Sequence, residues 1–268
     1  MKNLILSAAI GYNFIQIEFF LKSLRKFYKG EICFIISNEN LELEKKLKDY
    51  NCSTIKTKIH KKEIQFKRYE IYLDFLKDKF YDQILLCDSR DIYFQDSPFN
   101  FNYKGQINFF LEDFIIENCP FNTNWIVKTY GKEKFDKIAK KTILCSGTVL
   151  GNQNKIKEYL FLMCKNISNY KYKRRLKYAL TFRVDPEGRG CDQGHANYIV
   201  HNSMIDDFAF YSNSEGPFAT VYYLKKLNFD KSSKLINVTG KPYLLVHQYD
   251  KRWNIFSENF ENIKKIFD

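Results

Sequence analysis

The stretch of sequence that decides the fold is QILLCDSRDIYFQDSP, residues 83–98. Its apolar start, Ile84 to Leu86, is typical of a short buried strand, and two carboxylates, Asp88 and Asp91, follow it directly. In an open α/β sheet, ligands bind outside the carboxyl ends of the strands, so acids in this position face a cleft. A divalent cation prefers such oxygen ligands and can hold a diphosphate between them. The structural alternative is an aspartate that caps a turn, with Asp91 paired to Arg90.

Strand and helix patterns alternate on both sides of this stretch. Before it, we expect strands at 3–10, 31–37 and 53–59, and helices from 14 to near 30, at 41–49 and at 66–80. After it, we expect strands at 106–111, 142–151, 207–211, 235–238 and 243–247, and helices at 125–140, 155–167 and 191–201. This order predicts an α/β, Rossmann-like fold with a mostly parallel central sheet flanked by helices. Since no repeat or flexible linker interrupts residues 1–268, we expect a single domain with an elaborated second half.

The formal net charge of +12 on 268 residues has two interpretations. It favours an anionic partner, such as nucleic acid, a phosphorylated substrate or an acidic membrane surface. Alternatively, the lysines form a generic solvated surface in a chain that is rich in Lys, Asn, Ile, Phe and Tyr. The densest basic cluster lies between Lys165 and Arg183, where Tyr170, Tyr172 and Tyr178 are interleaved with the cations. This cluster keeps a surface-binding role open.

The cysteine content and the N-terminal segment predict a cytoplasmic protein. Seven cysteines, an odd number without zinc-ligand spacing, are typical of reduced thiols inside the cell. The apolar start of the chain fits a buried first strand better than a signal peptide, because no small-residue cleavage site closes it. No apolar run approaches the roughly 18 residues that cross a bilayer.

Three further segments carry polar side chains to the ends of expected elements. His247 ends a strand and can bind a transition metal, although a lone histidine there can equally be a hydrogen-bonded core residue. Asp192 and Gln193 open a helix after a glycine-rich loop, where an aspartate can also be the N-cap. Ser146 and Gly147 interrupt a strand with small residues that let a ligand approach the backbone closely.

Motifs of several other enzyme classes are missing from the sequence. There is no P-loop and no G-x-G-x-x-G, which excludes the kinase and dehydrogenase classes. No G-x-S-x-G elbow, and no supporting His and Asp, activates Cys145 or Ser146 as a nucleophile. The two aspartates and His247 therefore carry the main chemical signal.

Taken together, these segments resemble a GT-A-type glycosyltransferase that uses a nucleotide-sugar donor, and the likeness spans most of the chain. The matching positions, in chain order, are Ala8, Ala9 and Tyr12 of the first strand region, Arg68 on the helix before the acids, Asp88, Arg90 and Asp91, the strand from Cys145 to Gly151, Cys191-Asp192-Gln193-Gly194 with Asn197, and His247. The acids are spaced D-x-x-D, one residue longer than the D-x-D motif of the family. Counted back from Pro98, Asp91 matches the second aspartate and Ser89 falls at the first, so Asp88 fits only if a turn re-aims it.

The resemblance implies a role for each residue of the site. A Mn²⁺ or Mg²⁺ ion at Asp88, Asp91 and His247 would stabilise the departing nucleoside diphosphate. Asp192 and Gln193 would be the catalytic pair near the anomeric carbon. The carboxylate of Asp192 would stabilise an oxocarbenium ion, attack as a nucleophile or act as a base, and these roles stay open. Retention of configuration is favoured. Donor contacts would come from Ala8, Ala9, Tyr12, Arg68, Asp88, Arg90, Ser146, Gly147, Lys241, Lys251 and Arg252.

The implied reaction moves a sugar from a nucleotide sugar to a glycan or lipid-linked glycan, as in surface polysaccharide synthesis. Residues 1–100 would bind the nucleotide and residues 101–268 the sugar and acceptor, with the loop at 185–190 shaping the acceptor site. The basic cluster from Lys165 to Arg183 would allow peripheral contact with an anionic inner membrane face.

Two other functional classes remain open. A nucleic-acid-binding protein without catalysis would use the positive charge and the aromatic residues, although we expect no nucleic-acid partner. A nucleotidyltransferase on a similar fold would need a glycine-rich, lysine-bearing loop, which residues 8–13 lack.

Overall fold

A computed structural model describes residues 1–181, 191–265 and 267, with the side chains of 171–181 left out. The predicted loop at 185–190 lies outside the described residues. The same holds for the side chains of most of the basic cluster between Lys165 and Arg183.

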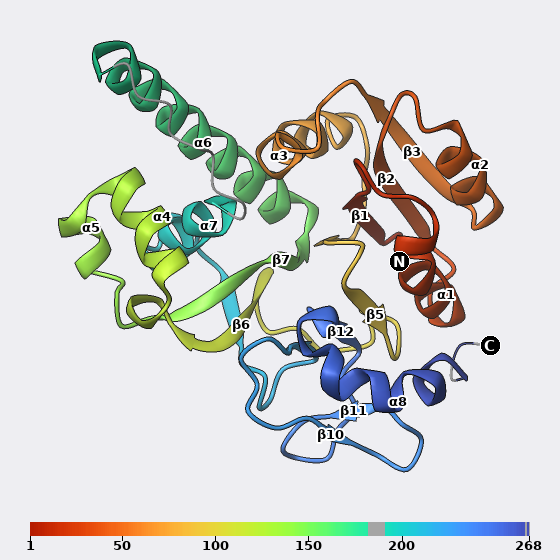
Figure 1. Cartoon of the computed structure of the whole chain (residues 1–268). Helices are drawn as coiled ribbons and strands as arrows, with labels where there is room; N and C mark the ends of the chain where they lie inside the picture. The colour runs from red at the N-terminus through yellow and green to blue at the C-terminus, as the bar shows by residue number, and fades with distance from the viewer. Residues whose placement is uncertain (182–190, 266, 268) are drawn as a thin grey trace.

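The core of the molecule is a seven-stranded sheet with the order β3-β2-β1-β4-β7-β6-β8 (Figure 1). Its strands are β1 (Leu4–Ala8), β2 (Glu31–Ser37), β3 (Cys52–Thr57), β4 (Gln83–Cys87), β6 (Ile107–Ile115), β7 (Thr142–Asn152) and β8 (Phe208–Tyr211). Every strand except β7 runs in the same direction, and β7 is antiparallel to both of its neighbours, β4 and β6. The predicted α/β class and mostly parallel sheet are confirmed.

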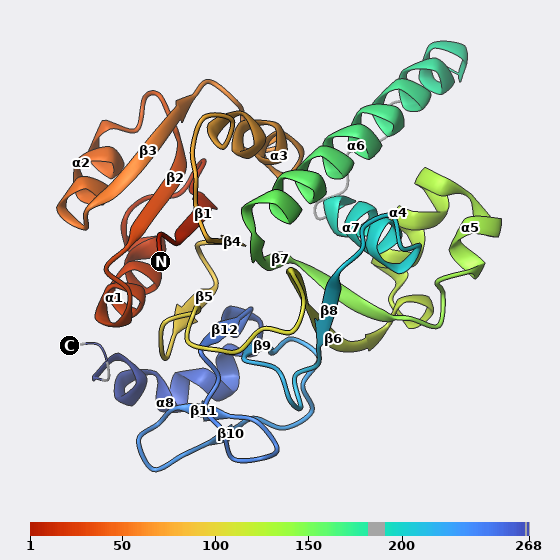
Figure 2. The same ribbon diagram turned by 180° about the vertical axis from the view of Figure 1, so that it is seen from behind.

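Helices cover both faces of this sheet. The helices are α1 (Ile15–Phe27), α2 (Leu41–Asp49), α3 (Ile64–Phe75), α4 (Pro120–Tyr130), α5 (Lys132–Asp136), α6 (Gln153–Thr181), α7 (Cys191–His201) and α8 (Trp253–Lys265). Because successive side chains of a strand point to opposite faces, Leu4 and Leu6 pack against α3, α6 and α7, whereas Ile5 packs against α1 and α2. The far end of α6 projects beyond the rest of the molecule in both views (Figures 1 and 2).

A second, smaller sheet brings the C-terminal part of the chain next to the main one. It consists of β5 (Ile92–Phe94), β12 (Leu245–His247) and β9 (Phe218–Thr220), with β12 in the middle. A separate two-stranded ribbon joins β10 (Asn228–Phe229) to β11 (Leu235–Ile236). Helix α8 buries Phe256 and Ile263 in the aromatic core that also contains Tyr93. Two short 3₁₀ helices, η1 (Ile116–Asn118) and η2 (Tyr249–Arg252), complete the fold.

Several element boundaries differ from the predicted ones. The helix expected over 125–140 is two helices, α4 and α5, because Gly131 adopts a φ of 90°, which ends the first of them. Strand β7 continues through Ser146 and Gly147, where an interruption was expected, and the irregularity lies in its pairing with β6. Strand β6 runs on to Ile115, so Glu112 lies inside a strand and not after one.

No helix in the described part of the chain has the length and apolar character that crossing a membrane requires.

Candidate active site

A cleft of about 900 Å³ opens at the carboxyl ends of β1 and β4. All but three of the site residues predicted from the sequence line it. They come from the end of β1 and the turn after it, from α3, β7, α7 and η2, and from the segments around β5 and β12: Ala8, Tyr12, Arg68, Asp88, Arg90, Asp91, Ser146, Gly147, Asp192, Gln193, His247 and Lys251. The tertiary fold therefore gathers residues from the whole length of the chain at one edge of the sheet.

Ala9, Lys241 and Arg252 are the three predicted residues that do not line the cleft. The side chain of Ala9 is fully buried in the core beneath α1, on the face of the chain opposite to Ala8. Lys241 lies in the turn after β11, where its backbone N–H donates to Oδ1 of Asn237 at 3.0 Å. Arg252 is also directed elsewhere, since its guanidinium donates to the backbone carbonyl of Tyr222 at 3.4 Å.

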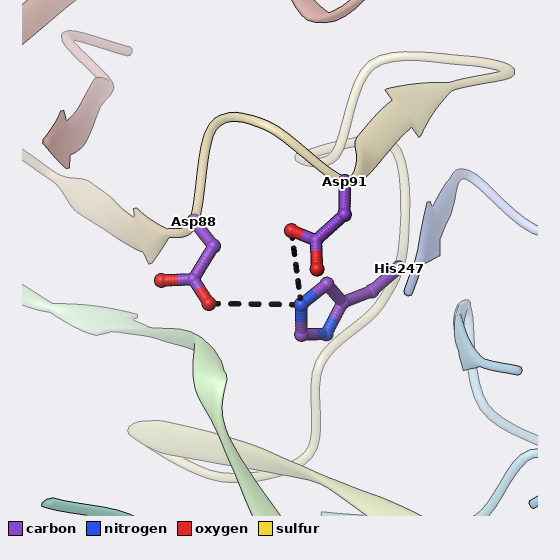
Figure 3. A group of neighbouring side chains, drawn as sticks. All are labelled: Asp88, Asp91 and His247. Atoms are coloured by element: carbon purple, nitrogen blue, oxygen red, sulfur yellow. Dashed lines mark ion pairs between the residues drawn. The ribbon is translucent and has the colours of Figure 1, made fainter. Parts of the chain in front are cut away.

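Asp88, Asp91 and His247 line the cleft, and their side chains point toward one another (Figure 3). Nε2 of His247 lies 3.7 Å from Oδ2 of Asp88 and 3.7 Å from Oδ1 of Asp91. The three ligand atoms all lie within 4.8 Å of one another. Ligands of one Mg²⁺ ion, bound at about 2.1 Å, lie roughly 3 Å apart when they are adjacent, so small side-chain shifts suffice. This cluster can hold a metal ion.

Strand pairing and a short turn create this convergence. In the small sheet, His247 of β12 pairs with Ile92 of β5, which places the imidazole beside Asp91. The turn between β4 and β5 re-aims Asp88, whose backbone N–H donates to the carbonyl of Gly147 at 2.9 Å. Ser89, at the position of the first aspartate in a D-x-D motif, instead donates its hydroxyl to the carbonyl of Ala8 at 2.8 Å. The D-x-x-D spacing thus delivers both carboxylates to His247.

Two neighbours orient the imidazole of His247. Sγ of Cys145 lies 3.2 Å from its Nδ1, which leaves Nε2 to face the two carboxylates. Such a partner on the second ring nitrogen is usual for metal-binding histidines. A Cβ at Gly147 would lie 2.5 Å from Cε1 of His247 and 2.7 Å from Oδ2 of Asp88. The glycine therefore makes room for the metal-binding side chains, and not only for a ligand.

Arg68 connects the metal-binding end of the cleft to Asp192. Its guanidinium donates to Oδ1 of Asp88 at 2.6 Å and to Oδ2 of Asp192 at 2.7 Å. The hydroxyl of Tyr69 donates to the same oxygen of Asp192 at 2.9 Å. Asp192 lies inside the first turn of α7, and these two bonds hold its buried carboxylate in place. We predicted a donor contact for Arg68; within the chain its guanidinium contacts the two carboxylates and also donates to the hydroxyl of Tyr69 at 3.3 Å.

The two aspartates have different electrostatic surroundings. Burial acts to raise the pKa of Asp88, but Arg68 and His247 outweigh it and hold that pKa below its ordinary value. Burial raises the pKa of Asp91, and His247 offsets this only in part. The guanidinium of Arg90 lies 4.0 Å from Asp91 and is paired at 2.7 Å with Asp250. A bound metal cation would supply the positive counter-charge that the carboxylate of Asp91 lacks.

Glu112 of β6 is a functional candidate that was not predicted from the sequence. Glu112 lines the cleft and is only 2% exposed, and its Oε1 has no hydrogen-bond partner among the described residues. Burial raises the pKa of Glu112 to about 7, against smaller lowering effects of His247, Gln193 and Cys145. In the sequence, Glu112 directly follows the strand predicted over 106–111, whereas in the structure it lies at an inward position of the longer strand β6.

A group of aromatic residues in the cleft was also missed. It comprises Phe121 and Trp125 of α4, and Tyr222 and Tyr223 after β9. Their positions in the sequence carry no shared motif, so only the fold brings them together.

No protein-family model matches this chain, and no curated protein matches it either. Its function must therefore be inferred from the cleft.

Proposed function

We propose that this protein is a metal-dependent glycosyltransferase of the GT-A type, which moves a sugar from a nucleoside-diphosphate sugar to a glycan acceptor. The observation that carries the proposal is the convergence of Asp88, Asp91 and His247 at the carboxyl edge of a doubly wound sheet. Two carboxylates and one imidazole are a ligand set that suits Mn²⁺ or Mg²⁺, with His favouring Mn²⁺.

The donor diphosphate fits the end of the cleft that is rich in cations. Lys61, Lys62, Arg90 and Lys251 line the same cleft as the metal-binding cluster. When bound, the metal neutralises charge on a departing nucleoside diphosphate. The basic side chains add attraction for the same anion, and Tyr12 offers an aromatic ring over which Lys61 lies at 4.7 Å.

The sugar of the donor fits the space in front of Asp192 and Gln193. Arg68 and Tyr69 hold the carboxylate of Asp192 by hydrogen bonds, which keeps it oriented for chemistry at the anomeric carbon. It can stabilise an oxocarbenium ion, attack as a nucleophile or accept a proton from the acceptor hydroxyl. We favour retention of configuration, because the late histidine and the Asp–Gln pair occur together.

Cell-surface polysaccharide or glycoconjugate synthesis is the process that we propose for this activity. The acceptor would be a glycan or a lipid-linked glycan, and the reaction would take place in the cytoplasm. The basic segment on α6 would bring the enzyme to the anionic inner face of the membrane. A nucleic-acid-binding protein would leave the convergence of Asp88, Asp91 and His247 without a specific role. A nucleotidyltransferase could use a metal there, but it would need the glycine-rich, lysine-bearing loop that residues 8–13 lack.

The deciding experiment is donor turnover by the purified protein across a panel of nucleotide sugars, with Mn²⁺, with Mg²⁺ and with EDTA. We expect hydrolysis of at least one donor with metal and none with EDTA. Asp91→Ala should abolish metal-dependent donor binding, because it removes one of three ligands. Asp74→Ala is the matched control, since Asp74 lies on α3 with 72% of its side chain exposed. If no donor is bound or turned over in the presence of metal, the proposed function is wrong.

A further inference from the structure

The cleft has two chemically different ends. The Lys and Arg side chains that line it among the described residues are Lys61, Lys62, Arg68, Arg90 and Lys251. The other end is built by α4 and by the residues after β9, and these segments contribute no Lys or Arg to the lining. That end therefore suits a ligand without negative charge.

Aromatic rings form the walls of this uncharged end. Phe121 is 67% exposed and Tyr222 is 45% exposed, although both line a cleft. Tyr223 is held in place by Phe114, since the two rings stack with centroids 4.3 Å apart and planes at 5°. Trp125 packs against the first turn of α7: a Cβ added at Gly194 would lie only 2.9 Å from Cβ of Trp125. These rings are accessible flat surfaces next to Gln193.

Two buried hydrogen-bond acceptors lie among these rings without partners. Oε1 of Glu112 and Oδ1 of Asn122 have no hydrogen-bond partner among the described residues, and each residue is only 2% exposed. The amide nitrogen of Asn122 is already engaged, since it lies 3.3 Å from Sγ of Cys119 and donates to it. A buried acceptor left unpaired destabilises the protein, and a ligand that donates hydrogen bonds removes this penalty.

The combination of features defines the ligand. A pyranose ring has an apolar C–H face that packs on aromatic rings, and hydroxyls at its rim that donate hydrogen bonds. A carboxylate or a phosphate dianion has no proton to donate to the unpaired oxygen of Asn122, and the segments that form this end contribute no Lys or Arg to the cleft lining. We propose that Phe121, Trp125, Tyr222 and Tyr223, with Glu112 and Asn122, form an acceptor subsite for an uncharged sugar ring. The role of this sugar as the acceptor rests on the proposed glycosyltransferase function, whereas the sugar-binding site itself is inferred from the residues that line the cleft.

Tryptophan fluorescence tests the subsite directly. The chain has two tryptophans, and Trp253 lies on α8 against Phe260, outside the residues that line the cleft. In a Trp253→Phe background, the emission reports on Trp125 alone. The ligands are methyl glycosides of glucose, galactose, mannose and N-acetylglucosamine in both anomers, their disaccharides, and the matching 6-phosphates and uronic acids.

We expect at least one neutral glycoside to change the emission of Trp125 saturably, and its anionic counterpart to bind at least about tenfold more weakly. Phe121→Ala should weaken the binding of that glycoside at least about tenfold, because it removes one wall of the subsite. Phe161→Ala is the matched control, since Phe161 is 56% exposed on α6 and does not line the cleft. The inference is overturned if no glycoside changes the emission, or if the anionic sugars bind as well as the neutral ones.

Donor turnover, measured on the same Trp253→Phe protein, separates this inference from the proposed function. If a nucleotide sugar is hydrolysed with metal but no glycoside binds, the subsite is wrong and the proposed function stands. If a neutral glycoside binds but no donor in the panel is bound or turned over, the sugar site stands and the transferase activity is wrong.

Discussion

Replacement of Glu112 by Gln should make the protein more stable at neutral pH, although it removes a charged residue from the cleft. In the folded chain, burial raises the pKa of Glu112 to about 7, whereas the ordinary value is 4.5. Between these two pH values the folded chain holds a proton that the unfolded chain has lost. The free energy of unfolding of the parent therefore falls as the pH rises through this window. Glutamine has nearly the same shape but no ionisation, so Glu112→Gln escapes this loss.

The size of the effect follows from the width of the window. A difference of about 2.5 pH units, at about 1.4 kcal/mol for each unit, corresponds to about 3 kcal/mol. The variant should gain none of this below about pH 4 and all of it above about pH 8. About 2 kcal/mol of the gain should develop between about pH 5 and about pH 7, where the protein is convenient to study.

The assay is urea unfolding of parent and Glu112→Gln across this pH range, in EDTA so that no divalent cation occupies the nearby cluster. Glu133→Gln is the matched control, because the side chain of Glu133 is 88% exposed and meets similar solvent in both states. Its difference from the parent should stay constant with pH. If the difference between Glu112→Gln and the parent is equally constant, within about 0.5 kcal/mol, then Glu112 is not desolvated as the structure describes.

Three further outcomes are expected. Gly147→Ala places a Cβ 2.5 Å from Cε1 of His247, so Mn²⁺ affinity measured by calorimetry should fall by at least about tenfold, whereas Ser146→Ala beside it should change affinity by less than about threefold. Binding of Mn²⁺ should release protons and become tighter as the pH rises. The reason is that Cys145 and the two aspartates raise the pKa of metal-free His247 in spite of burial, whereas an imidazole that binds a metal must be neutral. Calorimetry in buffers of different ionisation enthalpy measures the number of protons released, and a value of zero would contradict the assignment of His247 as a ligand. Asn197→Ala should lower the free energy of unfolding, measured by urea titration, by about 3 kcal/mol. The substitution leaves the buried backbone N–H and carbonyl of Leu144 without their hydrogen bonds of 2.9 and 3.0 Å to Asn197. Asn202→Ala, just after the end of α7, is the control and should lower the free energy of unfolding by less than about 1 kcal/mol.

The sequence predicted those residues of the candidate site that are neighbours in the chain or that adjoin a strong strand or helix pattern. Asp88 and Asp91 follow an unbroken apolar strand, and Asp192 and Gln193 begin a helix, so their approximate places follow from local geometry. Glu112 was missed because a carboxylate inside an apolar strand looks like the end of that strand until its neighbours are known. Lys241 was placed in the site by its closeness in sequence to His247, yet a turn directs it away.

By itself, the sequence determined the order and type of most elements, and with them the α/β class. This is possible because side-chain direction repeats with a period of two in a strand and 3.6 in a helix, so the buried face shows in the spacing of apolar residues. Only the tertiary structure decided which polar side chains meet. The pairing of His247 with Ile92, the turn that re-aims Asp88, and the gathering of Phe121 with Tyr222 depend on contacts between segments far apart in the chain. Local patterns carry no information about such contacts, because strand register and turn geometry arise from the packing of the whole molecule.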